Sequence, residues 1–82
     1  MINVNIKLFA GAREIAGTAD LRLSFAEGTP AGAVLETLIE RYPKFRDWKP
    51  YLRLAVNREY AAPDSVLHEN DEVAVIPPVS GG

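Results

Sequence analysis

Cysteine is absent from this chain of 82 residues, and His68 is its only histidine. The lack of cysteine excludes disulfides, thiolate nucleophiles and the commonest zinc ligands, and a lone histidine cannot assemble a multi-histidine metal site. We therefore expect no metal centre and no bound cofactor, and few routes to catalysis by the chain on its own.

Long apolar runs and an excess of positive charge are also missing. No stretch approaches the ~20 apolar residues that a membrane-spanning helix needs, and the N-terminus lacks the basic-then-apolar pattern of a signal peptide. The 9 Lys+Arg against 11 Asp+Glu give a formal net charge of −2, whereas a general nucleic-acid binder is expected to be basic. These absences predict a cytoplasmic protein that binds neither membranes nor nucleic acid.

The residues that are present have the balance of one globular domain, with 48% hydrophobic and 24% charged residues. Alternation of apolar and polar residues predicts strands over residues 2–8, 21–25, 52–57 and 72–76, with a short strand at 60–61. Apolar residues at helical spacing predict a helix over 30–41, with Thr29 as its N-cap and Pro30 at its first position. Residues 12–16 suit one helical turn, and residues 44–51 are predicted to be a connector.

This order of elements predicts an α+β fold. A single main helix covers only one face of a sheet, so the other face should stay open. The last strand is apolar at successive positions, which is typical of a strand with neighbours on both sides, and the long crossover allows it to run parallel to the first. The result is a β-grasp arrangement, a mixed sheet of about five strands with one main helix on one face, over residues 1–76.

Residues 77–82 form a separate tail with an unusual sequence, Pro77-Pro78-Val79-Ser80-Gly81-Gly82. The two prolines cannot donate to a sheet ladder and favour an extended path, so the tail should project from the domain. Gly81 and Gly82 have no side chain, so the end of the chain can pass through a channel too narrow for a Cβ. A loose terminus of no function is the plainer interpretation of the same residues.

Several segments together resemble the small subunits of molybdopterin synthase, a family of ubiquitin-like sulfur carriers. The matching segments are Lys7-Leu8-Phe9-Ala10 with Arg13-Glu14-Ile15-Ala16-Gly17, the Val56-Asn57 turn, Asp71-Glu72-Val73-Ala74 and the closing Pro77-Pro78-Val79-Ser80-Gly81-Gly82. They follow the family's order over nearly the whole chain. The closing segment is the specific part, because a diglycine end alone is shared by all ubiquitin-like carriers. Val75 and Ile76 stand where the family often has aromatic residues.

The resemblance implies a function for the carboxylate of Gly82. In that family a ubiquitin-activating-like adenylyltransferase uses ATP to convert this carboxylate to an acyl-adenylate, which a sulfur nucleophile then converts to a thiocarboxylate. The tail enters the large synthase subunit, where the thiocarboxylate donates sulfur toward the dithiolene of molybdopterin. The resemblance therefore implies a non-catalytic carrier subunit with two protein partners and no bound cofactor.

A carrier of this kind also needs a docking surface near its tail. Strand alternation places Phe9 opposite the core residues of the first strand and Ile76 opposite those of the last, so both should face outward. Tyr60, on the short strand, is expected to complete an exposed apolar patch, and such patches commonly mark partner sites. Arg13 is a candidate for an added charge contact, with a solvated loop arginine as the plainer alternative.

Three other interpretations stay open at this stage. Residues 41–53 interleave five basic residues with Phe45, Trp48 and Tyr51, which is a weak nucleic-acid signal; aromatics that anchor a connector onto the core explain it better. A carrier for another pathway, such as thiamine synthesis, tRNA thiolation or cysteine synthesis, would use the same tail. A β-grasp interaction module without covalent chemistry would tolerate mutations of the tail.

Overall fold

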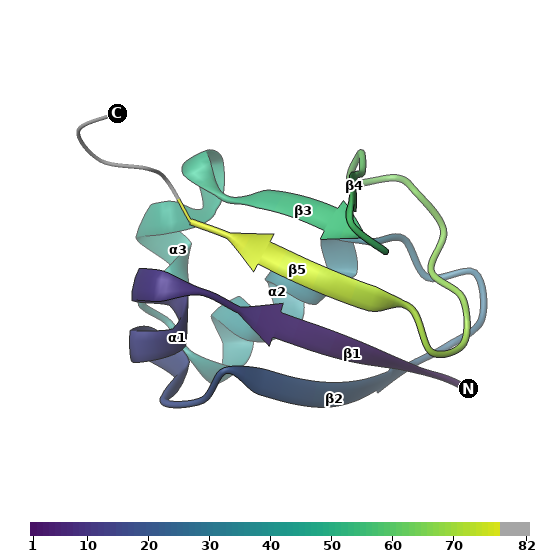
Figure 1. Ribbon diagram of the computed structural model, residues 1–82, viewed down its shortest axis with the longest axis horizontal. Helices are drawn as coiled ribbons and strands as arrows, with labels where there is room; N and C mark the ends of the chain where they lie inside the picture. Colours follow the sequence, from purple (N-terminus) through teal and green to yellow (C-terminus); the bar gives the residue numbers. More distant parts are fainter. Residues whose placement is uncertain (78–82) are drawn as a thin grey trace.

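The computed structural model describes residues 1–77, which form one mixed five-stranded sheet with helices on one of its faces (Figure 1). The strand order is β2-β1-β5-β3-β4. Its strands are β1 (Ile2–Leu8), β2 (Asp20–Phe25), β3 (Arg53–Val56), β4 (Glu59–Tyr60) and β5 (Glu72–Ile76). β5 lies at the centre and pairs in parallel with β1, whereas all other neighbours are antiparallel. The predicted β-grasp arrangement is confirmed.

The core lies between the sheet and the main helix α2 (Gly32–Arg41). Burial alternates along β1 and β5, since a strand turns successive side chains to opposite faces. The inward residues of these two strands meet the apolar face of α2; they are Ile2, Val4, Ile6, Leu8, Val73 and Val75 on the strands and Val34, Leu35, Leu38 and Ile39 on the helix. The opposite face of the sheet carries no helix within residues 1–77 (Figure 1).

The main helix was predicted to begin at Pro30 but begins at Gly32, and its N-cap residue is Ala31 and not the predicted Thr29. Thr29 does not cap the helix; its hydroxyl donates to the carbonyl of Ala26 at 2.6 Å. The amides of Ala31 and Gly32 donate instead to the backbone carbonyls of Ser65 and Pro63. A loop distant in sequence thus satisfies the first amides of the helix, which local sequence signals do not reveal. The predicted end at Arg41 is confirmed.

Two predicted loops contain more helix than expected. The turn foreseen at 12–16 is part of α1 (Ala10–Ala16), and the connector at 44–51 contains α3 (Phe45–Trp48) and a 3-10 helix (Lys49–Tyr51). Phe45 is fully buried and stacks edge-to-face with Tyr42, with ring centroids 6.1 Å apart. The indole of Trp48 lies so close to Gly11 of α1 that a Cβ there would come within 2.5 Å of it. Aromatic packing therefore explains the helical connector.

No helix within the described part of the chain combines the length and the apolar character needed to cross a membrane.

Candidate functional site

The predicted tail begins at the end of the central strand. β5 ends at Ile76, and Pro77, the first residue beyond it, is half-buried. The remaining predicted tail residues, Pro78, Val79, Ser80, Gly81 and Gly82, lie outside the described residues. Because β5 is paired on both sides, its position in the sheet is fixed, and the surface around Ile76 is where the chain leaves the strand.

An apolar strip crosses the open face of the sheet beside this point. The strip consists of Phe9, Ala55, Tyr60, Ala74 and Ile76. Register places its members side by side: Ala74 of β5 pairs with Ala55 of β3, which pairs with Tyr60 of β4. Ile76 lies two residues beyond Ala74 and shares its face, because side chains of a strand alternate. The structure thus brings together three of the four predicted docking residues.

Phe9 joins the strip although it lies just outside the strand. β1 ends at Leu8, and Phe9 is the N-cap residue of α1, with extended backbone angles of φ −124° and ψ 152°. The extended backbone continues the alternation past Leu8, so Phe9 turns away from the core, with 52% of its surface exposed. Tyr60 is 75% exposed, whereas Ile76 is half-buried. Arg13 is exposed on α1, outside the strip.

Charged side chains border the apolar strip on two sides. Lys7, which pairs with Ala74 across β1 and β5, forms an ion pair with Asp20 of β2. The hydrogen bond from Lys7 to the Asp20 carboxylate, together with the negative charge of that carboxylate, raises the pKa of Lys7 above its ordinary value. On the other side Arg53 pairs with Ile76 across β3 and β5 and is exposed. An apolar strip framed by charges is suited to oriented docking of a protein.

Tyr51 is an exposed aromatic residue that the sequence interpretation missed. The sequence predicts that Phe45, Trp48 and Tyr51 anchor the connector onto the core. Phe45 and Trp48 do pack inward, but the 3-10 helix begins at Lys49 and leaves Tyr51 65% exposed. Pro50, inside that 3-10 helix, was the available signal, because proline disrupts continued α-helix.

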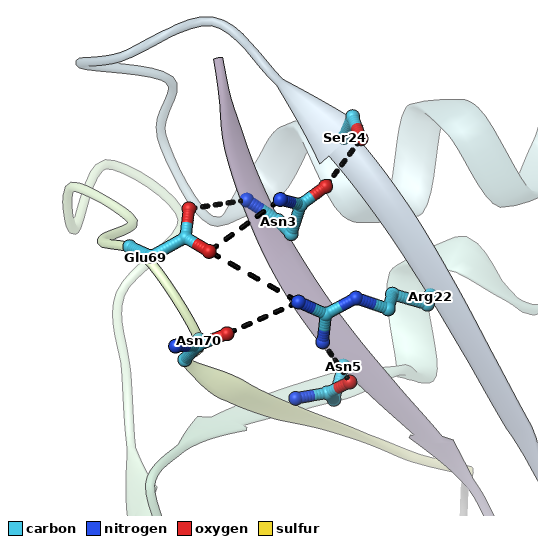
Figure 2. A network of polar contacts seen from close by, with 6 residues as sticks. All are labelled: Asn3, Asn5, Arg22, Ser24, Glu69 and Asn70. Carbon is cyan, nitrogen blue, oxygen red and sulfur yellow. Dashed lines mark hydrogen bonds and ion pairs between the residues drawn. The ribbon is translucent and has the colours of Figure 1, made fainter.

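The half of the open face away from the tail is polar and hydrogen-bonded (Figure 2). Arg22 donates to the amide oxygens of Asn5 and Asn70 at 2.7 and 3.1 Å, and its guanidinium lies 4.0 Å from Glu69. Asn3 donates its backbone amide to Glu69 and accepts from Ser24. These contacts tie the turn before β5 to β1 and β2, so the open face divides into an apolar half beside the tail and a polar half that braces the turn.

A buried carboxylate, that of Asp71, also holds the turn that leads into β5. Asp71 is the one buried polar residue in the described chain, and it accepts hydrogen bonds from the backbone amide of His68 at 2.8 Å and from Nδ2 of Asn57 at 3.0 Å. Asn57, whose φ is +52°, accepts in turn from the amide of Glu72 at 3.0 Å. Two segments that carried the family resemblance, the Asn57 turn and the Asp71 entry, are therefore in direct contact.

We predict that Asp71→Ala lowers the free energy of unfolding by about 2 kcal/mol, because it leaves the His68 amide and the Asn57 side chain without their acceptor. Urea unfolding followed by circular dichroism measures the change. Asp64→Ala is the matched control: Asp64 is exposed and accepts no hydrogen bond within residues 1–77, so its loss should change stability by less than about 0.5 kcal/mol. Equal effects of the two substitutions would contradict the role given to Asp71.

Residues 1–77 hold no group of three His, Cys, Asp or Glu side chains close enough to bind a metal ion. His68 is 78% exposed at its side chain and lies 3.9 Å from Asp71, in the turn that precedes β5. The described residues thus place an exposed apolar strip beside the end of β5.

Comparison with known proteins identifies the family. The model of the ThiS family matches residues 6–82. The molybdopterin synthase sulfur carrier subunit of Arabidopsis thaliana is 35% identical over 99% of this chain and 84% of its own length.

Two solved structures have the same fold. A putative molybdopterin converting factor subunit 1 from Pyrococcus furiosus has a TM-score of 0.86 and 30% identity over 96% of this chain and 100% of its own. The small archaeal modifier protein 1 of Methanosarcina acetivorans has a TM-score of 0.81 and 32% identity over 100% of this chain and 98% of its own. The family model and these relatives match nearly the whole of this chain, and the chain therefore belongs to the ThiS family.

Proposed function

We propose that this protein is the sulfur carrier subunit of a molybdopterin synthase and that it carries sulfur as a thiocarboxylate on Gly82. The observation that supports this most is the position of the apolar strip at the root of the tail, on the strand that leads into it. A partner that covers Phe9, Tyr60 and Ile76 would receive the tail in a fixed direction. The relatives named as sulfur carrier subunits support the chemistry assigned to the tail.

The proposed loading chemistry needs two steps. The carboxylate of Gly82 attacks the α-phosphate of ATP on a ubiquitin-activating-like adenylyltransferase, which forms an acyl-adenylate and releases pyrophosphate. A sulfur nucleophile supplied by a sulfur donor then displaces AMP and leaves the thiocarboxylate. The chain needs no cysteine for this, since the carbonyl carbon at its own end accepts the sulfur. Adenylation is required because a free carboxylate is a poor electrophile.

Delivery is proposed to occur inside the large synthase subunit. The tail residues Pro77 to Gly82 would enter that subunit, with Gly81 and Gly82 passing where a side chain has no room. The thiocarboxylate would donate one sulfur atom toward a dithiolene, and a water molecule would supply the oxygen that replaces it on the carbonyl carbon, so that Gly82 returns as a carboxylate for another cycle. The acid and base groups belong to the large subunit in this scheme, and the carrier contributes a positioned substrate in the cytoplasm.

Intact-mass spectrometry tests the proposal directly. The purified protein is incubated with the activating enzyme, ATP and a sulfur donor, and the expected product has one terminal oxygen replaced by sulfur. The loaded protein should then convert to the carboxylate form when the large subunit and its substrate are added. Finding only the carboxylate form after the first incubation would contradict the proposal.

A second function is supported by the similarity to a small archaeal modifier protein. In that case the same acyl-adenylate would be attacked by a lysine amine of another protein, which gives an amide and releases AMP. The two functions differ in the nucleophile. Recovery of the chain in amide linkage to other proteins, with no thiocarboxylate form, would favour the modifier function over the sulfur carrier function.

A further inference from the structure

The outer edge of β3 is only half covered. β3 pairs along all four of its residues with β5, but its other neighbour, β4, contains two residues and pairs only with Ala55 and Val56. The amide of Ala61 extends the contact by donating to the carbonyl of Leu54 at 3.0 Å. The chain then leaves the sheet, so the first half of the β3 edge has no neighbouring strand within residues 1–77.

Two backbone groups on this edge have no hydrogen-bond partner among residues 1–77. The backbone amide of Asn57 donates to the carbonyl of Glu72 in β5. Because backbone groups alternate between the two edges of a strand, the N–H and C=O groups of Arg53 and Ala55 point toward β5. The corresponding outward-pointing groups, the C=O of Leu52 and the N–H and C=O of Leu54, point toward the outer edge of β3. Among the described residues, no acceptor pairs with the Leu54 amide and no donor pairs with the Leu52 carbonyl. One residue of an added strand satisfies both groups with its own C=O and N–H.

A hollow lies against the same edge. It has a volume of about 410 Å³ and is lined by residues of α2, of the uncovered part of β3 and of the segment around β4. Three leucines that are otherwise almost buried line it, together with residues of the segment that follows β4; the lining residues are Leu35, Leu52, Arg53, Leu54, Tyr60, Ala61 and Pro63. Apart from Arg53, the lining residues are aliphatic or aromatic.

Arg53 supplies a charge at this place. Its side chain lies on the open face, opposite to Leu52 and Leu54, and is exposed. No carboxylate within residues 1–77 forms an ion pair with it. A residue that pairs with Arg53 across an added strand would place its side chain on the same face, within reach of the guanidinium.

We propose that the β3 edge and its hollow are a docking site for an extended peptide segment of a partner protein, with the pattern apolar-acidic-apolar. The acidic residue pairs with Arg53 and exchanges main-chain hydrogen bonds with Leu52 and Leu54. Its two neighbours turn to the other face and fill the hollow between β3 and α2. This is strand addition, in which main-chain bonds give affinity and alternate side chains give specificity.

The site is distinct from the tail chemistry but close to it. Arg53 pairs with Ile76, the last residue of β5, and Tyr60 belongs both to the hollow and to the apolar strip. A peptide bound at the β3 edge would extend the surface that a partner of the tail covers. The inference does not depend on sulfur transfer, because it rests on the strand edge, the hollow and Arg53.

Titration of the ¹⁵N-labelled full chain with a capped peptide Ser-Val-Glu-Val-Ser tests the proposal by NMR. The amide of Leu54 should shift downfield and exchange more slowly with solvent, with further shifts at Leu35, Leu52 and Ala61. Methylation of the central peptide nitrogen removes the bond to the Leu52 carbonyl and should weaken binding about tenfold. Replacing glutamate with lysine in the peptide should weaken it about fivefold.

The protein variant Arg53→Glu should reverse the preference, so that the lysine peptide binds better than the glutamate peptide. Arg46→Glu is the control with the same charge change; Arg46 is exposed on α3 and does not line the hollow, so it should keep the original order. Equal affinity of the methylated peptide, or shifts confined to residues away from the β3 edge, would overturn the proposal. Concentration-dependent shifts at Leu54 without peptide would overturn it in favour of pairing between two copies of this chain.

Discussion

Deletion of Gly82 is expected to abolish loading with sulfur while leaving the free energy of unfolding unchanged. The deletion moves the terminal carboxylate back by one residue, about 3.3 to 3.6 Å along an extended chain, and a misplacement of about 1 Å can cost a hundredfold in rate. The fold should not respond, because the core ends with Val75 on β5 and Gly82 lies beyond that strand. Intact mass after incubation with activating enzyme, ATP and sulfur donor measures loading, and urea unfolding measures stability.

Two further variants separate the effect of tail length from the effect of side-chain bulk in the tail. One extra alanine after Gly82 changes the reach of the tail, whereas Gly81→Ala keeps the reach and adds one methyl group. We expect the extended chain to fail in loading and Gly81→Ala to load or transfer sulfur more slowly, since the added Cβ needs room in the partner's channel. Normal loading of the chain without Gly82 would show that the terminal carboxylate of Gly82 is not the carrier group.

The central part of the fold could be predicted because burial follows simple periodicities. In β1 the alternation from Ile2 to Leu8 matches the observed burial residue by residue, and β5 has the predicted bounds of 72–76. The successive apolar residues of β5 correctly indicated a strand with two neighbours. Such strands are specified locally, since one face must meet the helix and each residue's face is set by parity.

Features that depend on contacts between distant segments could not be predicted. The backbone carbonyls of Pro63 and Ser65 accept hydrogen bonds from the amides at the start of α2. A loop more than thirty residues away therefore caps the helix in place of the predicted N-cap, Thr29. Helix α3 forms because Phe45 is buried and Trp48 packs on Gly11. In both cases tertiary packing decides what the local sequence leaves open.

The same division applies to the candidate site. Parity sufficed to turn Phe9 and Ile76 outward, and exposure at Tyr60 followed from its short strand. These residues form one strip with Ala55 and Ala74 only because of the register of three strand pairs. That register could not be predicted from the sequence. The short strand was predicted at 60–61 and lies at Glu59–Tyr60, but the hollow beside β3 depends on how the chain after it packs near Leu35 of α2, which no local pattern indicates.

Phe9→Asp is expected to weaken binding to a large synthase subunit about thirtyfold or more, since a large exposed aromatic at the centre of an interface typically contributes about 2 kcal/mol or more. The stability of the fold, in contrast, should not fall. Phe9 is the N-cap of α1 and makes no capping hydrogen bond there, and aspartate is among the preferred N-cap residues. The free energy of unfolding should therefore stay the same or rise by up to about 1 kcal/mol. Calorimetric titration and urea unfolding measure the two quantities.

The control for Phe9→Asp is Val66→Asp. Val66 is 49% exposed, close to the 52% of Phe9, but it lies in the loop before β5, where it bridges to Pro30, and outside the apolar strip. Each variant removes an exposed apolar side chain and adds the same charge. A difference between them in binding to the large subunit would therefore come from the position of the substituted residue on the surface. If Val66→Asp weakens binding as much as Phe9→Asp, the loss reflects net charge and the strip is not the docking surface. A loss confined to Phe9→Asp, together with unchanged or raised stability, assigns the effect to the strip, because a variant at least as stable as the parent cannot lose binding by unfolding.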